Sequence, residues 1–210
     1  MKEFLLMSGG LDSTTLAYKL KNENSNEIEG LFIDYGQPTA SEEFERVQEI
    51  GGDLSINIRR VDLSTIWRNF EDQGLDPHAL ACTETSNIFA PLLMAATFAS
   101  AAGGTKLHSA FHKTDAELYP STFSVLKAQE HVMQANEKTQ NFEYVLPFKE
   151  LTKAEVVSIG KEINVPFDKT LSCLNINKKE KGHCGECSSC KTRKESFKKA
   201  AVEDKTMYST

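Results

Sequence analysis

Residues 4–15 read Phe-Leu-Leu-Met-Ser-Gly-Gly-Leu-Asp-Ser-Thr-Thr, and this stretch decides the fold. The apolar run Phe4–Met7 is typical of a buried strand, and a helix is expected to follow from Leu11. Gly9 and Gly10 let the backbone turn sharply between the two and bring bare N–H groups close to an anion. The positive end of the helix dipole and the unpaired amides of the first turn lie at the same place. The stretch therefore predicts a strand, a phosphate-binding loop and a helix.

The side chains of this loop are suited to a phosphate group. The hydroxyls of Ser8, Ser13 and Thr14 can donate hydrogen bonds to phosphate oxygens, and Asp12 is expected to hold Mg²⁺ or to fix the loop. The loop is not a Walker A motif, because no Gly-Lys-Ser or Gly-Lys-Thr closes it. The alternative is an ordinary strand–turn–helix junction in which Asp12 and the serines cap the helix.

Apolar runs alternate with helical patterns along the chain. Strands are expected over Phe4–Met7, Ile28–Asp34, Ile56–Val61, Lys106–Phe111 and Phe142–Leu146. Helices are expected over Leu11–Leu20, Glu42–Ile50, Ile88–Ala102, Thr122–Glu137 and from the capping box Thr152–Glu155 to Glu162. This alternation predicts an α/β fold with a doubly wound, mostly parallel sheet and helices on both faces. A long loop over residues 69–87, rich in Asp, Gly and Pro, is typical of a functional or mobile segment.

Ligands of such sheets bind beyond the carboxyl ends of the strands. The segments expected at that edge are Ser8–Ser13, Asp34–Gln37, the residues after Phe111, and Pro147–Lys149. We expect one α/β domain over residues 1–165 and a small C-terminal tail over residues 166–210 that packs on the same domain.

The composition limits the classes of function. Of the 210 residues 40% are hydrophobic, enough for a sizeable core, and the net charge of −6 gives no general attraction for nucleic acid or an anionic membrane. The one candidate basic surface, Lys191-Thr192-Arg193-Lys194 with Lys198-Lys199, is more typical of a solvated helix face. Met1-Lys2-Glu3 leads directly into the first strand, so no secretory signal is expected. The longest apolar run, Ile88–Gly103, is too short for a membrane span, and a cytoplasmic protein is expected.

Four cysteines form a metal-binding pattern. Cys184-Gly-Glu-Cys187-Ser-Ser-Cys190 is a doubled C-x₂-C, and Cys173 lies eleven residues upstream of it. Four thiolates satisfy the tetrahedral coordination of Zn²⁺ and leave no position for a reactive water, which predicts a structural zinc that holds the tail to the domain. Disulfides, an iron–sulfur cluster and a redox-active thiol pair are the alternatives, and the expected cytoplasmic location disfavours the first. Cys82 is expected to be a plain small side chain, and His183 to be a neighbour of the cluster and not a ligand.

The loop Ser8–Ser13 resembles the pyrophosphate loop of the N-type ATP pyrophosphatases, enzymes that cleave ATP between the α- and β-phosphates and leave AMP on a substrate. Together with Phe32-Ile33-Asp34-Tyr35-Gly36-Gln37 and the tail that begins Thr170-Leu171-Ser172-Cys173, it closely resembles the 7-cyano-7-deazaguanine synthases over nearly the full length. The resemblance implies an adenine nucleotide alpha hydrolase-like fold, the use of ATP and Mg²⁺, and a homodimer. In the implied reaction the carboxylate of 7-carboxy-7-deazaguanine is adenylated, ammonia displaces AMP to give an amide, and a second activation dehydrates the amide to the nitrile. This nitrile is a precursor of queuosine and archaeosine.

The resemblance also implies roles for single residues. The expected catalytic residues are Asp12, Ser13 and Lys153, of which Lys153 would meet the negative charge that develops in the reaction. The expected nucleotide- and cofactor-binding residues are Met7, Ser8, Gly9, Gly10, Leu11, Asp12, Ser13, Thr14, Asp34, Tyr35 and Gln37. The expected substrate-binding residues are Asn87, Asp115 and Tyr119, and the expected metal ligands are Cys173, Cys184, Cys187 and Cys190. The alternatives are an exposed lysine at a helix start for Lys153 and an aromatic side chain at the core edge for Tyr35.

Two short segments depart from the family pattern. Ser86-Asn87 stands where the family usually has Arg-Asn, and Tyr119-Pro120 is followed by Ser121-Thr122-Phe123 instead of Asp-Cys-Arg. Arginine is a strong partner of phosphate and carboxylate groups, so its loss removes cationic contacts from the site. The candidates to compensate are Lys113, Arg59 and Arg60.

The altered segments leave other functions as alternatives. One is a divergent relative that activates the same acid and transfers it to another amine, such as a protein amine, for example in an antiviral defence system. A tRNA-modifying sulfur- or lysine-transferring ligase is disfavoured by the acidic net charge and the compact length. A non-catalytic, zinc-stabilised binding module is disfavoured by the intact loop Ser8–Ser13. The expected partners are thus a small deazapurine acid and an amine donor, with neither a membrane nor a nucleic acid among them.

Overall fold

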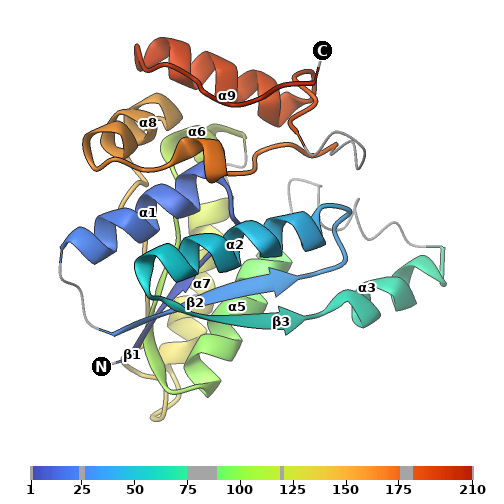
Figure 1. Cartoon of the computed structure of the whole chain (residues 1–210). Coiled ribbons are helices and arrows are strands. Elements are labelled where there is room, and N and C mark those ends of the chain that lie inside the picture. The colour runs from blue at the N-terminus through green and yellow to red at the C-terminus, as the bar shows by residue number, and fades with distance from the viewer. Residues whose placement is uncertain (1, 24–26, 75–88, 119–120, 176–181, 210) are drawn as a thin grey trace.

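The computed structural model describes residues 2–23, 27–74, 89–118, 121–175 and 182–209 (Figure 1). One sheet of parallel strands contains β1 (Lys2–Leu6), β2 (Ile28–Asp34), β3 (Asn57–Asp62), β4 (Gly104–His108) and β5 (Glu143–Val145). The strand order is β3-β2-β1-β4-β5. The chain builds outward from β1 in one direction and then returns to place β4 on its other side. The carboxyl ends of β1 and β4 therefore form the switch point at which doubly wound sheets bind ligands.

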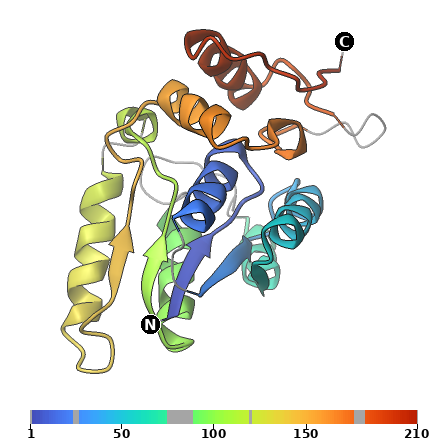
Figure 2. The ribbon, with the colours of Figure 1, turned by 60° about the vertical axis from the view of Figure 1, so that its left-hand side comes forward.

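Helices cover both faces of the sheet, as the sequence predicts (Figures 1 and 2). The described helices are α1 (Leu11–Asn22), α2 (Ala40–Leu54), α3 (Ser64–Glu71), α5 (Phe89–Ala101), α6 (Lys113–Leu118), α7 (Thr122–Gln134), α8 (Lys153–Glu162) and α9 (Ser188–Lys199), with a 3₁₀ turn over Phe167–Lys169. The core on one face includes side chains of α1, α2 and α8, and the core on the other includes side chains of α5 and α7. Helix α9 lies outside α8, at the top of both views.

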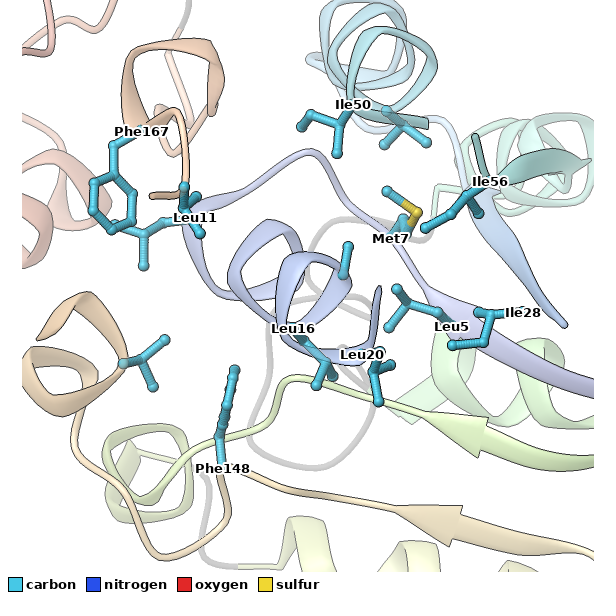
Figure 3. Packing of buried hydrophobic residues seen from close by; sticks show 14 of the residues in the cluster. Leu5, Met7, Leu11, Leu16, Leu20, Ile28, Ile50, Ile56, Phe148 and Phe167 are labelled. Carbon is cyan, nitrogen blue, oxygen red and sulfur yellow. The ribbon is translucent and has the colours of Figure 1, made fainter. Parts of the chain in front are cut away.

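The central strands are buried on both sides, which explains why they read as continuous apolar runs. Every residue of β2 is buried. In β1, Phe4 packs in the core on the α5 side, whereas Leu5 packs on the α1 side with Leu16 and Leu20 (Figure 3). Each fully buried leucine or phenylalanine side chain of this kind adds about 1.5–3 kcal/mol to the free energy of unfolding.

The structure corrects several expected boundaries. The pattern misses the short helices α3 and α6, and α3 occupies the first residues of the segment expected to be a loop over 69–87. The signal for α3 is Asp62, whose carboxylate accepts a hydrogen bond from the Ser64 N–H at 2.8 Å and so starts the helix. Residues 75–87 of that loop lie outside the described residues. The strand expected to reach Phe111 ends at His108, because its edge partner β5 is only 3 residues long.

The C-terminal tail packs against the same core as α1 and α8. Phe197 of α9 belongs to this core, and its ring meets the ring of Phe167 edge-on with the centroids 5.0 Å apart. The division into residues 1–165 and 166–210 stays a prediction.

Candidate active site

The loop between β1 and α1 is held by hydrogen bonds between its own serines. Ser13 Oγ accepts from the Ser8 N–H at 3.2 Å, lies 3.1 Å from Ser8 Oγ, and donates to the Gly10 carbonyl at 3.2 Å. Ser8 Oγ accepts from the Gly10 N–H at 3.3 Å. Gly10 is the N-cap residue of α1 and supplies no side-chain cap, so the first amides of the helix have no cap that an anion must displace.

Gly9 is required by both its conformation and its neighbours. It adopts a positive φ of 70°, and a Cβ atom there would lie 2.8 Å from the Glu43 carbonyl oxygen and 3.0 Å from Arg46 Cβ, both on α2. The Gly9 carbonyl accepts from the Leu171 N–H at 2.8 Å. The loop is therefore clamped between α2 and the first residues of the tail, and a side chain at this position would push it out of place.

An ion pair joins the loop to α8. The Oδ2 atom of Asp12, the second residue of α1, lies 2.7 Å from the Nζ atom of Lys153. Both side chains are mostly buried. Lys153 stands at the start of α8, where Thr152 forms a capping box with Glu155. The Lys153 N–H also donates to Thr114 Oγ1 at 3.3 Å. The expected catalytic residues Asp12 and Lys153 are thus in direct contact, although 141 positions separate them in the chain.

His112 lies beside the ion pair of Asp12 and Lys153, and the sequence did not predict it as a site residue. It follows β4 and lies with its Nε2 atom 3.6 Å from Asp12 Oδ1 and its Nδ1 atom 3.2 Å from Asp115 Oδ2. The signal that could have found it is its place just beyond the carboxyl end of a strand, in the segment after Phe111 already expected at the ligand edge.

The charges of this group set the pKa values of its two carboxylates. Burial on its own would raise the pKa of Asp12, but the Lys153 ammonium, helped by His112, holds that pKa well below its ordinary value. Burial raises the pKa of Asp115, and the neighbouring Asp12 carboxylate raises it further. Asp12 is therefore ionised at neutral pH and available to a cation.

The segment after β2 shapes the neighbouring edge of the site. Asp34 Oδ1 accepts from the Gly36 N–H at 2.9 Å, and its Oδ2 pairs with Arg60. Gln37 Oε1 accepts from the Tyr35 N–H at 3.0 Å, while its Nε2 donates to a Glu43 carboxylate oxygen at 2.8 Å. The side chains of Asp34 and Gln37 are therefore engaged in forming the turn, and their contacts with a nucleotide stay a prediction.

Several expected binding residues are buried. Met7 and Leu11 are part of the core, so only their backbone atoms can face a ligand. Thr14 is fully buried, and its hydroxyl has no hydrogen-bond partner among the described residues. Asn87 and Tyr119, two of the three expected substrate residues, lie outside the described residues.

Of the three residues expected to compensate for the missing family arginines, two already form ion pairs and one is exposed. Arg59 forms an ion pair with Glu29 at 2.9 Å, and Arg60 pairs with Asp34, so both are engaged on the sheet. Lys113 is exposed at the start of α6, directly after His112.

The four expected metal ligands come together. The sulfur atoms of Cys173, Cys184, Cys187 and Cys190 all lie within 4.8 Å of one another, and Cys184 Sγ is 4.0 Å from Cys190 Sγ. Four thiolates on one Zn²⁺ at about 2.3 Å would be about 3.8 Å apart. Backbone N–H groups donate to three of the sulfurs at 3.3–3.4 Å. N–H groups of Glu186 and Cys187 lower the pKa of Cys184 to about 6, which favours the thiolate that a metal binds. The cluster can hold one metal ion.

His183 lies beside this cluster and supports the chain around it. Its Nε2 atom accepts from the Ser172 N–H at 2.9 Å, and its ring meets Tyr208 with the centroids 5.8 Å apart. Burial and the Arg193 guanidinium lower the pKa of His183 to about 4, so the ring is neutral. His183 thus fixes the segment that carries Cys173.

Arg193 corrects the interpretation of residues 191–199 as one solvated face. Its side chain is 0% exposed. The guanidinium donates at 2.8–2.9 Å to oxygen atoms of four residues: Phe167, Thr170, Ser172 and Thr206. The neighbouring lysines of α9 are exposed. Arg193 therefore ties α9 to the segment that leads from the 3₁₀ turn to the cysteine cluster.

Arg193→Leu is expected to lower the free energy of unfolding by about 3–5 kcal/mol, because it leaves several buried acceptors without a donor. Lys198→Leu, at an exposed position of the same helix, is expected to change it by about 0.5 kcal/mol or less. Urea denaturation of the metal-loaded proteins measures both. Equal stabilities of the two variants would contradict the role of Arg193.

The strand order and the glycine loop at the switch point of the sheet define a class of protein, the doubly wound α/β proteins with a ligand site beyond the carboxyl ends of the strands. The fold is shared with the NMN synthetase from Francisella tularensis, with a TM-score of 0.56 and 12% identity over 96% of this chain and 78% of that one. It is also shared with the U34-tRNA thiolase NcsA from Methanococcus maripaludis with its [4Fe-4S] cluster, with a TM-score of 0.52 and 12% identity over 97% and 74% of the two chains.

Comparison of the sequence identifies the family within this class. A family model described as "Queuosine biosynthesis protein QueC" matches residues 2–201, and the chain belongs to this family. The 7-cyano-7-deazaguanine synthase of a Nitratiruptor species is 30% identical over 224 residues, 99% of each chain. The 7-cyano-7-deazaguanine synthase 1 of Sulfurisphaera tokodaii is 31% identical over 209 residues, 99% of this chain and 98% of the relative. None of the described helices is both long and apolar enough to cross a membrane.

Proposed function

We propose that the protein is an ATP-dependent carbon–nitrogen ligase that converts 7-carboxy-7-deazaguanine to 7-cyano-7-deazaguanine with ammonia. The observation that carries the proposal is the loop Ser8–Ser13, with its uncapped helix start, next to the ion pair of Asp12 and Lys153 at the switch point of the sheet. Membership of the QueC family supports the deazapurine acid as the substrate.

In the proposed reaction the substrate carboxylate attacks the α-phosphorus of ATP, and pyrophosphate leaves. The amides at the start of α1 and the serine hydroxyls would bind the phosphates, and Lys153 would turn from Asp12 to the negative charge that develops on them. Ammonia then displaces AMP and gives the amide. In the second activation the amide oxygen attacks the α-phosphorus of a second ATP, and a second pyrophosphate leaves. Loss of AMP and protons from this adduct gives the nitrile, so two molecules of AMP and two of pyrophosphate accompany each nitrile.

Two metal ions belong to the proposal. Mg²⁺ would enter with the nucleotide and neutralise the departing pyrophosphate, and Asp12 is the ionised carboxylate of the loop that fits it. Zn²⁺ would occupy the four-cysteine cluster, since the set of four sulfurs leaves no position for water and suits a structural ion. The family resemblance further supports a homodimer, which the mass of the protein in solution tests.

The test is incubation of the purified protein with ATP, Mg²⁺, 7-carboxy-7-deazaguanine and ammonium, followed by mass spectrometry. The expected products are the nitrile, pyrophosphate and two AMP per nitrile, with no AMP when the acid is omitted. An adenylate or amide that accumulates under these conditions would contradict nitrile formation and favour transfer to another amine. Absence of acid-dependent AMP would contradict the ligase function itself.

A further inference from the structure

His112 occupies a position between two carboxylates with its ring orientation set by one of them. The side chain is 2% exposed. The backbone N–H of Asp115 donates to the ring atom Nδ1 of His112 at 3.2 Å. In return, the Asp115 carboxylate accepts a hydrogen bond from the backbone N–H of His112, also at 3.2 Å. Because Nδ1 accepts from this backbone N–H, the ring proton is placed on Nε2, and the Asp115 Oδ2 atom 3.2 Å from Nδ1 is then a close neighbour of that nitrogen and not its hydrogen-bond acceptor. The ring therefore presents an N–H donor on its other side.

That donor faces Asp12 across an incomplete hydrogen bond. His112 Nε2 and Asp12 Oδ1 are 3.6 Å apart, and both atoms are buried without a hydrogen-bond partner among the described residues. A buried polar atom without a hydrogen-bond partner destabilises the folded state. An approach of about 0.5–0.9 Å would bring the two within 2.7–3.1 Å, where a charge-assisted hydrogen bond is strong. His112 Nε2 and Asp12 Oδ1 are thus placed to form a hydrogen bond when Lys153 leaves Asp12.

The proposed function requires such a loss. Asp12 Oδ2 is held by Lys153 at 2.7 Å, and Lys153 must leave it to reach a phosphate. A mostly buried carboxylate that loses its cation is destabilised, unless a second donor takes over. His112 is the donor nearest to the remaining oxygen among the pairs that the structure describes.

We propose that His112 is a positioning residue that holds Asp12 Oδ1 through its Nε2–H group, so that Lys153 can move from Asp12 to the phosphates of the nucleotide. Asp12 Oδ2 is then free to meet the cation that accompanies them. Asp115 fixes the tautomer of the ring through its N–H group. This inference rests on the proposed function for the identity of the nucleotide, but it makes a separate statement about nucleotide affinity.

A matched pair of variants tests it, because each amide side chain reproduces one nitrogen of the imidazole. His112→Gln keeps a donor at the place of Nε2 and retains the contact with Asp12. His112→Asn keeps an acceptor at the place of Nδ1 and loses that contact. Glu117→Gln, at an exposed position of α6, controls for the change of a polar side chain nearby.

The readout is the dissociation constant of Mg²⁺ with α,β-methylene-ATP, an analogue that cannot be cleaved between the α- and β-phosphates, measured by calorimetry. His112→Asn is expected to weaken binding by about 10- to 100-fold, and His112→Gln by about 3-fold or less. Equal affinities of the two variants, whether both are impaired or both unchanged, would overturn the proposal. Thermal unfolding confirms that each variant is folded at the temperature of the measurement.

A second measurement needs no variant. Nitrogen-15 NMR of the wild-type protein with labelled histidine is expected to show His112 protonated on Nε2, and a proton on Nδ1 would overturn the proposal. Both readouts are independent of catalysis. Failure of the wild-type protein to release AMP would remove the proposed function, whereas the affinity difference and the tautomer would still decide the role of His112.

Discussion

Replacing Asp12 by alanine is expected to lower the rate of acid-dependent AMP release by at least about 10²- to 10³-fold, the usual cost of removing one electrostatic group from an active site. The reason is the double role that we propose for its carboxylate, which pairs with Lys153 and would meet the Mg²⁺ ion that enters with the nucleotide. The release of AMP from radiolabelled ATP measures the effect.

The fold of this variant should persist, because the Asp12 side chain belongs to neither of the two hydrophobic cores. Glu150→Gln is the matched control, since its side chain is 83% exposed and contacts only Lys149 at 3.9 Å among the described ion pairs. Turnover of Asp12→Ala equal to that of this control would remove Asp12 from the mechanism.

The same variant has a signature in the dependence of stability on pH. The folded-state pKa of Asp12 lies below that of the unfolded chain, about 3.9, so its ion pair stabilises the fold above that pH and is lost as the pH falls through the folded-state value. Wild-type stability should therefore decrease more steeply below about pH 4 than that of Asp12→Ala.

Cys187→Ser is expected to lose about one bound metal ion per chain and to unfold the tail over residues 166–210. Structural zinc sites of this type bind with an apparent free energy of about 10–16 kcal/mol in small peptides, and that energy contributes directly to folding. Elemental analysis gives the metal content, and limited proteolysis followed by mass spectrometry detects the tail. Cys82→Ser, the same chemical change at the one cysteine that does not belong to the C-x₂-C pattern or to its upstream partner Cys173, should keep the metal. A variant that stays fully stable without metal would refute the structural role.

Unfolding of the tail should also disturb the conformation of the loop Ser8–Ser13. The Leu171 N–H donates to the Gly9 carbonyl at 2.8 Å, and Cys173 follows only two positions later. The cysteine cluster therefore holds in place the segment that supports the glycine turn. Through this contact a metal ion held by the cluster would support the loop that we propose binds the nucleotide.

Much of the fold was readable from local patterns. The continuous apolar runs predicted the central strands, because strands buried on both faces contain few polar residues, and the capping box at Thr152 predicted the start of α8. Helices α3 and α6 were missed because each is short, with 8 and 6 residues, and too few turns remain for a periodic signal.

The sequence by itself determined the class of protein, through the glycine loop after the first strand and through the spacing of the four cysteines, since both patterns are local and their chemistry depends on few neighbours. Tertiary structure alone decided which residues meet. The Asp12–Lys153 pair, the place of His112 against Asp12 and the burial of Arg193 join segments that are 100 or more positions apart in the first two cases and 13 to 26 in the third. Contacts at such separations depend on how the sheet and the tail pack, and no local pattern in the chain encodes them.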